Sequence, residues 1–267
     1  MVVNGSGLNT VVLVKQVPDT YSERGLRTSD GALDRDAADA VLDEINERAV
    51  EAALQLREAH GGTVTVLTMG PPRAAEAIRK ALSMGADAAV HLADDGLAGS
   101  DAVGTARALA AAVRSVGEVD LVLAGNEASD GRSAAVPAMV ADVLDLPALT
   151  HAREIVVEGA EVTVRRETDD GVVVLRAELP AVVSVHEKIN EPRYPSFKGI
   201  MAAKKKKVTA LTVADLGLDP ATLGAAGALT RVTAATPKPP KAAGDKLVDD
   251  GDGGARVAAF LAAQKLI

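Results

Sequence analysis

The stretch from Gly125 to Val136, which reads GNEASDGRSAAV, is the part of the chain best suited to bind an anion. It follows an expected buried strand, Val119–Ala124, and runs into an expected helix, Ser133–Leu144. Free backbone amides at the start of a helix can hold a phosphate without a basic side chain. Gly125 and Gly131 let the backbone approach a ligand closely. The sequence therefore makes this loop a candidate phosphate-binding site.

The same loop lacks the features that make a phosphate motif specific. It contains neither the lysine of a P-loop nor a GxGxxG pattern. From the residues alone, an ordinary strand-to-helix turn remains the alternative.

A second unusual stretch, residues 179–207, reads LPAVVSVHEKINEPRYPSFKGIMAAKKKK. Its apolar strand, Ala181–Val185, leads into a polar segment whose two prolines discourage helix, and Phe197–Lys207 can then become helical. The protein has only two Tyr and two Phe, yet Tyr194 and Phe197 stand three residues apart here. Because large rigid side chains dominate interface energetics, this stretch is a candidate contact point. The alternative is a loop that tucks its own aromatics inward.

No catalytic constellation is found in the sequence. The chain has no cysteine, which excludes disulfides, thiolate catalysis and cysteine-based metal sites. Its four histidines lie far apart, and neither a Ser-His-Asp order nor an HExxH motif occurs. Asp19, Asp130 and Arg132 are candidates only for polar positioning. This pattern is typical of a carrier whose chemistry belongs to a cofactor.

Composition favours an ordinary soluble protein of one large domain plus an appendage. The 267 residues are 48% hydrophobic and 25% charged, enough to bury a core. The net charge of −8 gives a general nucleic-acid role no electrostatic support, although Lys204–Lys207 is a local basic exception. No apolar run reaches the ~20 residues of a membrane span. The first residues do not resemble a signal peptide, so a cytoplasmic location is the default expectation.

The first half of the chain alternates strand and helix four times. The expected strands are Thr10–Lys15, Thr63–Met69, Asp87–Leu92 and Val119–Ala124. The expected helices are Asp39–Ala59, Arg73–Met84, one capped by Ser100 or Asp101, and Ser133–Leu144. This alternation predicts an α/β fold with a doubly wound, mainly parallel, Rossmann-like sheet. Ligands of such sheets lie beyond the carboxyl ends of the strands, where Gln16–Thr20, Met69–Pro72 and Gly125–Val136 are expected.

Three other segments complete the predicted organisation. Tyr21–Asp36 is a long polar excursion with hairpin character, and such long connections are often functional. Residues 154–177 alternate polar and apolar side chains and predict an antiparallel hairpin extension of the sheet. Residues 219–244 are rich in Ala, Pro, Thr and Lys and predict an extended arm, followed by a short helix over Gly254–Ile267. We therefore expect a nucleotide-binding domain over residues 1–218 and a C-terminal arm for partner contact over residues 219–267.

The run NEPRYPSFKGIMAAKKKK resembles the beta subunit of electron transfer flavoprotein, as do VLVKQVPD near the start and DLVLAGNEASDG in the middle. The resemblance covers roughly residues 10–218. It implies a heterodimer with an alpha subunit, one shared FAD, and an AMP buried in this subunit. It also implies that electrons come from acyl-CoA and related dehydrogenases, as in fatty acid beta-oxidation, and pass to a membrane quinone reductase. Whether the second nucleotide is AMP or another FAD stays open.

The resemblance also assigns residues to these roles. The nucleotide-binding positions that it implies are Leu13, Asp43, Glu44, Ile45, Asn46, Met69, Gly125, Asn126, Glu127, Ala128, Ser129, Asp130, Gly131, Arg132, Ser133, Ala134, Ala135 and Val136. The partner-docking positions are Arg193, Tyr194, Phe197, Ile200 and Met201. The chain departs from the family pattern at Ala134 and Ala135, where polar residues are common, and at Phe197, where leucine is usual.

Two other functions are compatible with parts of this sequence. A stand-alone, universal-stress-type nucleotide-binding regulatory domain shares the parallel sheet but has no need for PRYPSFKGIM or for a C-terminal arm. An enzyme acting on an adenylate would need catalytic polar residues that the sequence lacks. A yellow heterodimer would indicate the electron carrier, and a colourless homodimer the regulatory domain.

Overall fold

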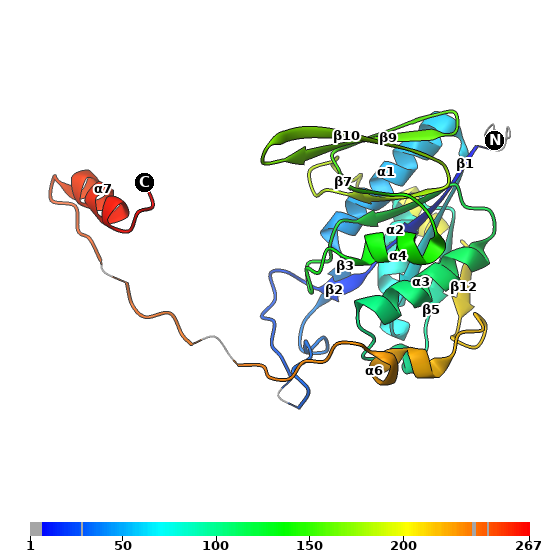
Figure 1. Cartoon of the computed structure of the whole chain (residues 1–267), viewed down its shortest axis with the longest axis horizontal. Coiled ribbons are helices and arrows are strands. Elements are labelled where there is room, and N and C mark those ends of the chain that lie inside the picture. Colours follow the sequence, from blue (N-terminus) through cyan, green and yellow to red (C-terminus); the bar gives the residue numbers. More distant parts are fainter. Residues whose placement is uncertain (1–6, 28, 237–238, 245) are drawn as a thin grey trace. The chain divides into compact units, whose positions relative to one another are not determined.

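The computed structural model describes residues 7–267 with the exception of residues 28, 237, 238 and 245. The chain forms two compact units, one ending at Thr233 and the other beginning at Ala234. The first unit holds the sheets and the candidate site (Figure 1). None of the helices in these described residues is long and apolar enough to cross a membrane.

A seven-stranded sheet forms the centre of the first unit (Figure 1). Its strands are β1 (Leu8–Leu13), β4 (Gly62–Met69), β5 (Ala88–Leu92), β6 (Leu121–Gly125), β7 (Ala148–Ala152), β11 (Ala181–Val185) and β12 (Val208–Leu211). The order is β12-β5-β4-β1-β6-β11-β7, and all neighbours pair in parallel. The central strands are apolar on both faces because helices cover both. The predicted doubly wound α/β fold is confirmed.

Two hydrophobic cores lie on opposite faces of this sheet. Leu8 and Val12 of β1 join the core that contains α1 (Glu44–His60) and α2 (Ala75–Met84). Val11 and Leu13, which point the other way along the pleat, join the core that contains α3 (Ala102–Val116) and α4 (Val136–Leu144). The order of winding changes direction at β1, since β4 and β5 lie on one side of it and β6 on the other. A ligand crevice is expected at this switch point.

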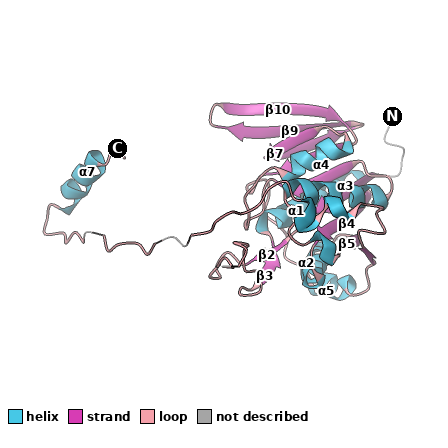
Figure 2. Ribbon diagram, turned by 60° about the horizontal axis from the view of Figure 1, so that its bottom comes forward, coloured by secondary structure: helices cyan, strands magenta, loops and turns pink. Residues whose placement is uncertain are grey.

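The predicted antiparallel region is confirmed as β8 (Glu154–Glu158), β9 (Glu161–Thr168) and β10 (Gly171–Glu178). These strands form a sheet of their own, in the order β10-β9-β8, and do not continue the parallel sheet. The edge strand of the parallel sheet beside β11 is β7, a short strand that the sequence pattern did not predict (Figure 2).

Three predicted helix boundaries were wrong, each for a local reason. The helix expected from Asp39 begins at Glu44, because β3 (Ala40–Leu42) pairs antiparallel with β2 (Gln16–Pro18). The helix expected from Ser133 begins at Val136, because Ala134 has a φ of 53° and cannot be helical. The helix expected over residues 197–207 is α5 (Phe197–Ala203), and the unpredicted strand β12 follows soon after it.

The excursion over residues 21–36 has the expected hairpin character. Leu26 and Leu33 form an antiparallel bridge, and the amide of Arg27 donates to the carbonyl of Ala32. The connections elsewhere include three short 3₁₀ turns, η1 (Pro72–Ala74), η2 (Asp95–Leu97) and η3 (Pro220–Thr222).

The start of the predicted extended arm is not extended. Residues 220–227 form η3 and the short helix α6 (Gly224–Gly227), and Leu223 between them is buried in the first unit. The described residues between α6 and α7 (Gly253–Ala263) form no helix or strand, and Pro237 and Lys238 of the arm lie outside the described residues. The division of roles at residue 218 stays a prediction.

Candidate functional site

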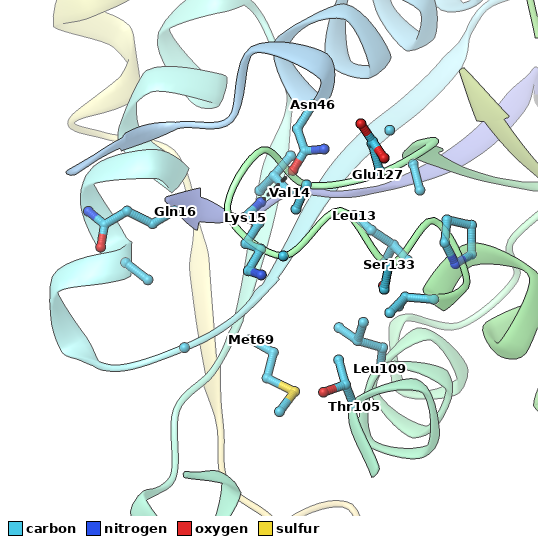
Figure 3. A pocket seen from close by; sticks show the side chains of 18 of the residues that line it. Leu13, Val14, Lys15, Gln16, Asn46, Met69, Thr105, Leu109, Glu127 and Ser133 are labelled. Carbon is cyan, nitrogen blue, oxygen red and sulfur yellow. Dashed lines mark hydrogen bonds between the residues drawn. The ribbon is translucent and has the colours of Figure 1, made fainter. Parts of the chain in front are cut away.

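A cavity of about 330 Å³ opens at the switch point, beyond the carboxyl ends of β1, β4 and β6 (Figure 3). Leu13 ends β1, Met69 ends β4 and Gly125 ends β6, and all three line the cavity. Its size lies at the lower end of the range of about 300–1,000 Å³ that is usual for small-molecule sites. The predicted position of the ligand site therefore coincides with a cavity.

The lining of this cavity has an apolar part and a polar part. Met69 and Leu109 lie on one side, together with Thr105, and Asn46 and Glu127 lie on the opposite side (Figure 3). A lining of this kind suits a ligand with a flat apolar body and a charged end. Nucleotides have this character.

Asn126 has an unsatisfied buried acceptor beside the cavity. Its side-chain oxygen, Oδ1, is buried and has no hydrogen-bond partner among the described residues, and the residue lines the cavity. A buried acceptor without a donor is destabilising, and an amine or a hydroxyl of a ligand would remove that cost if the side chain turned toward the cavity. This unpaired oxygen is the observation that fits a nucleotide most directly.

Cationic side chains that sequence reasoning missed also line the cavity. Lys15, Arg35 and Arg73 join the predicted Arg132 there, and Glu127 is the carboxylate of the same lining. Each cation has a carboxylate partner: Lys15 and Arg35 share Asp130, Arg73 pairs with Asp36, and Arg132 pairs with Glu127. Four cations face three carboxylates, so the remaining excess of one positive charge favours an anion only weakly. The position of Lys15 at the end of the first strand could have predicted that it lies near the ligand site. No local sequence feature indicates that Arg35 or Arg73 lies there.

Asp43 holds the start of α1 and the Gly125–Val136 loop together. It is fully buried, and its Oδ1 accepts from the amides of Ile45 (3.0 Å) and Asn46 (3.3 Å). Its Oδ2 accepts from the amide of Ser129 at 2.8 Å. The side chain thus caps the helix and anchors the loop, and it does not line the cavity.

Asp130 is a second buried anchor of the same loop. Its side chain is 0% exposed and pairs with Lys15 Nζ at 2.8 Å and with Arg35 Nη2 at 2.5 Å. Burial alone would raise the pKa of the Asp130 carboxyl, but the two cations hold that pKa below its usual range. Asp130 is therefore ionised at neutral pH and fixes both cations beside the cavity.

The backbone of the loop is unusual at Arg132 and Ala134. Their φ values of 48° and 53° lie in the left-handed region, which costs a residue other than glycine about 1–3 kcal/mol. Nothing among the described residues accepts from the amides of Ser133, Ala134 or Ala135. The free amides therefore belong to a left-handed turn ahead of α4 and not to the first turn of that helix. Turns of this kind can bind anions, and anion binding at this turn stays a prediction.

The structure brings most of the predicted nucleotide residues together. Those that line the cavity are Leu13, Asn46, Met69, Gly125, Asn126, Glu127, Ala128, Gly131, Arg132, Ser133, Ala134 and Val136. Those that do not line it are Asp43, Glu44, Ile45, Ser129, Asp130 and Ala135. Contact of any of them with a nucleotide stays a prediction. Within the described part of the chain, no group of three His, Asp or Glu side chains could hold a metal ion.

The predicted docking residues lie on another part of the first unit. Tyr194 is 95% exposed and Phe197 81% exposed, and Ile200 and Met201 of α5 are exposed beside them. The aromatics therefore do not tuck inward. Arg193 differs from the rest, because its guanidinium turns toward α1 and contacts Glu51 and Glu58. A docking role for these five residues stays a prediction.

Comparison with known proteins identifies similar chains. The family model described as electron transfer flavoprotein domain matches residues 30–216. The electron transfer flavoprotein subunit beta of Mycobacterium tuberculosis is 60% identical over 264 residues, which cover 97% of this chain and 99% of the relative. The subunit of the same name from Mycobacterium leprae is 61% identical with the same coverage. The caffeyl-CoA reductase-Etf complex subunit CarD of Acetobacterium woodii is 36% identical, covering 90% of this chain and 92% of the relative.

A methyl group at Gly125 should reduce nucleotide binding. A Cβ there would lie 2.6 Å from Asn46 Nδ2 and 3.0 Å from Ile45 Cγ2, so the Asn46 side chain, which lines the cavity, would have to shift. Gly25 does not line the cavity, and a Cβ there would meet nothing within 4 Å. We expect Gly125→Ala to lower the nucleotide content of the purified protein, with Gly25→Ala as the control. Equal nucleotide content in both variants would contradict the role of the Gly125 contact.

Proposed function

The chain belongs to the electron transfer flavoprotein family, as a beta subunit, and from this membership and the cavity we propose that it binds AMP beyond β1, β4 and β6. With an alpha subunit it would form a heterodimer that carries one FAD at the subunit interface. FAD supplies the redox chemistry when it is bound, and this chain supplies binding and positioning. The family consists of electron carriers, and we infer no catalytic residue in this subunit.

The unpaired Oδ1 of Asn126 is the observation that best supports a nucleotide in the cavity. An amine or a hydroxyl of a nucleotide is the kind of donor that could satisfy it. The free amides near Ala134 and the side chains of Lys15, Arg35 and Arg132 could hold the phosphate.

Docking of a dehydrogenase is proposed for the exposed surface formed by Tyr194, Phe197, Ile200 and Met201. A large aromatic at position 197 would serve as the anchor, because such side chains carry much of the energy of an interface. Acyl-CoA dehydrogenases are the proposed donors, and a quinone reductase is the proposed acceptor. The name of the Acetobacterium relative, which places it in a complex with a CoA-ester reductase, supports enzymes of this class as partners. A cytoplasmic location is part of the same proposal.

The stand-alone regulatory domain is not supported as an alternative. Similarity to beta subunits extends over 97% of the chain, and so includes the exposed surface and the C-terminal arm that a stand-alone domain would not need.

The nucleotide content of the heterodimer tests the proposal as a whole. The chain should be co-expressed with its alpha subunit, and the nucleotides released by denaturation should be identified by mass spectrometry. We expect a yellow heterodimer with one AMP and one FAD. Two FAD molecules per heterodimer would reject AMP as the ligand, and a colourless homodimer would reject the electron-carrier role.

Truncation of the docking aromatics should weaken the interaction with a dehydrogenase. An interface anchor can contribute about 2 kcal/mol or more, which is about thirtyfold in affinity. Phe197→Ala should therefore raise the KM of an acyl-CoA dehydrogenase for the heterodimer, with the melting temperature and the nucleotide content unchanged. Tyr194→Ala should act in the same direction. Tyr21→Ala, which removes a tyrosine of equal exposure elsewhere, is the control. A lower melting temperature with normal kinetics would show that Phe197 is structural.

Removal of the second unit should weaken assembly and leave the fold intact. No residue beyond Leu223 belongs to either hydrophobic core of the described chain, while Phe260 and Leu266 of the second unit are exposed. We expect a chain ending at Thr233 to keep its circular dichroism spectrum and its melting temperature. Its dissociation constant for the alpha subunit, measured by sedimentation, should rise. Unchanged affinity would mean that the second unit has no role in assembly.

A further inference from the structure

The segment between β11 and α5, residues 186–196, carries the exposed Tyr194 and leads to Phe197; we call it the docking loop. It has no helix or strand, and its residues 190–195 make no backbone–backbone hydrogen bond to any described residue. A loop of this kind would be expected to sample many conformations. Its conformation must therefore be held by side chains.

One face of α1 provides these side chains. The guanidinium of Arg48 donates to the carbonyl of Asn190, whose side-chain amide donates back to the carbonyl of Arg48 at 3.0 Å. One turn further along, Glu51 receives three hydrogen bonds from Arg193: from the amide (3.1 Å), from Nε (2.7 Å) and from Nη2 (2.9 Å). Glu58 accepts from Nη1 of the same arginine at 2.6 Å. Arg193 is thus held by two carboxylates that lie two helical turns apart.

The two carboxylates differ in burial. The Glu51 side chain is 5% exposed and the Glu58 side chain 54% exposed. Burial alone would raise the pKa of Glu51, but the bonds from Arg193 keep that pKa below its usual range, so the group is ionised at neutral pH. A buried carboxylate that loses its cation is strongly destabilised. Movement of the docking loop away from α1 is therefore unfavourable, because it would leave the Glu51 carboxylate without its cation.

The other end of the docking surface is also fixed. A Cβ at Gly199 of α5 would lie 2.5 Å from the backbone carbonyl oxygen of Ser83, at the end of α2. The glycine lets the two helices approach closely, so Phe197 begins a helix that is itself held in place. The exposed aromatics thus lie between two fixed points, Arg193 and Gly199.

We propose that Glu51 is a positioning residue for partner docking: through Arg193 it holds the docking loop in the conformation that presents Tyr194 and Phe197. This role rests on the proposed docking function. A loop that is already ordered loses less conformational entropy when its partner binds, and this raises affinity without any new contact. Glu51 would act on the strength of docking and not on electron transfer within the complex. Sequence reasoning missed it, because nothing local distinguishes it from other glutamates of α1.

The test compares Glu51→Gln with Glu58→Gln in the heterodimer that contains FAD and AMP. An acyl-CoA dehydrogenase with its acyl-CoA substrate is the probe, and flavin reduction gives KM for the heterodimer and kcat. Glu51→Gln should raise KM about tenfold with kcat unchanged, and hydrogen exchange should accelerate at the amide of Arg193, which donates to Glu51, and not in α1. Glu58→Gln should change KM by about twofold or less, because an exposed ion pair contributes little.

Arg193→Lys provides a second variant in case Glu51→Gln folds poorly. Lysine keeps the charge but cannot form parallel hydrogen bonds to two carboxylates, so the same rise in KM is expected. An unchanged KM in both variants would overturn the proposal. So would a rise in KM accompanied by loss of AMP and faster exchange throughout α1, since Glu51 would then support the fold and not the loop.

Phe197→Ala in the same assay distinguishes failure of the docking function from failure of the positioning role of Glu51. If Phe197→Ala raises KM and neither Glu51→Gln nor Arg193→Lys does, docking stands and the positioning role of Glu51 is rejected. If Phe197→Ala, like Glu51→Gln and Arg193→Lys, leaves KM unchanged, the docking function is rejected together with the positioning role of Glu51.

Discussion

The buried carboxylate of Asp43 is the interaction on which the candidate site depends. It caps α1, receives the amide of Ser129 from the loop after β6, and its own amide donates to the carbonyl of Lys15 after β1. Three segments from different parts of the chain therefore meet at one residue. Because the side chain is fully buried, loss of the Ser129 amide would leave Oδ2 without a hydrogen-bond partner, and loss of the amides at the start of α1 would do the same to Oδ1. These bonds hold the loop after β6, which lines the cavity, against the start of α1.

α1 links the two surfaces to which we assign function. Its first turn supplies Asp43 and Asn46 to the cavity loops, and its later turns supply Glu51 and Glu58 to Arg193. The helix is packed against the sheet along most of its length, since nine of its residues are buried. A helix with so little freedom can hold two loops in constant positions relative to the sheet. The proposed nucleotide site and the proposed docking surface therefore share one rigid support.

Charge is distributed unevenly in this acidic protein, and the distribution has local causes. Lys15 and Arg35 are held beside the cavity by the buried Asp130. Lys206, in the basic run after α5, is partly buried and donates to the carbonyls of Leu82 and Ala86 at the end of α2. The ammonium group of Lys206 is therefore used in hydrogen bonds within the protein, whereas Lys204, Lys205 and Lys207 are exposed. The basic run is thus partly a helix cap and partly a charged surface next to the docking aromatics.

The sequence by itself determined the parallel, doubly wound character of the sheet, the four strand–helix pairs of the first half of the chain, and the sheet edge at which the cavity lies. Runs such as Val11–Leu13 and Leu121–Ala124 are apolar on both faces, so their structure follows from local pattern. Only the tertiary structure decided the short edge strands β7 and β12, because they are stabilised by one neighbour each and carry little apolar pattern. It also decided the anchors of the site. Lys15 and Asp130 are separated by 115 residues, and Glu51 and Arg193 by 142, and a pairing of charges over such distances leaves no local trace.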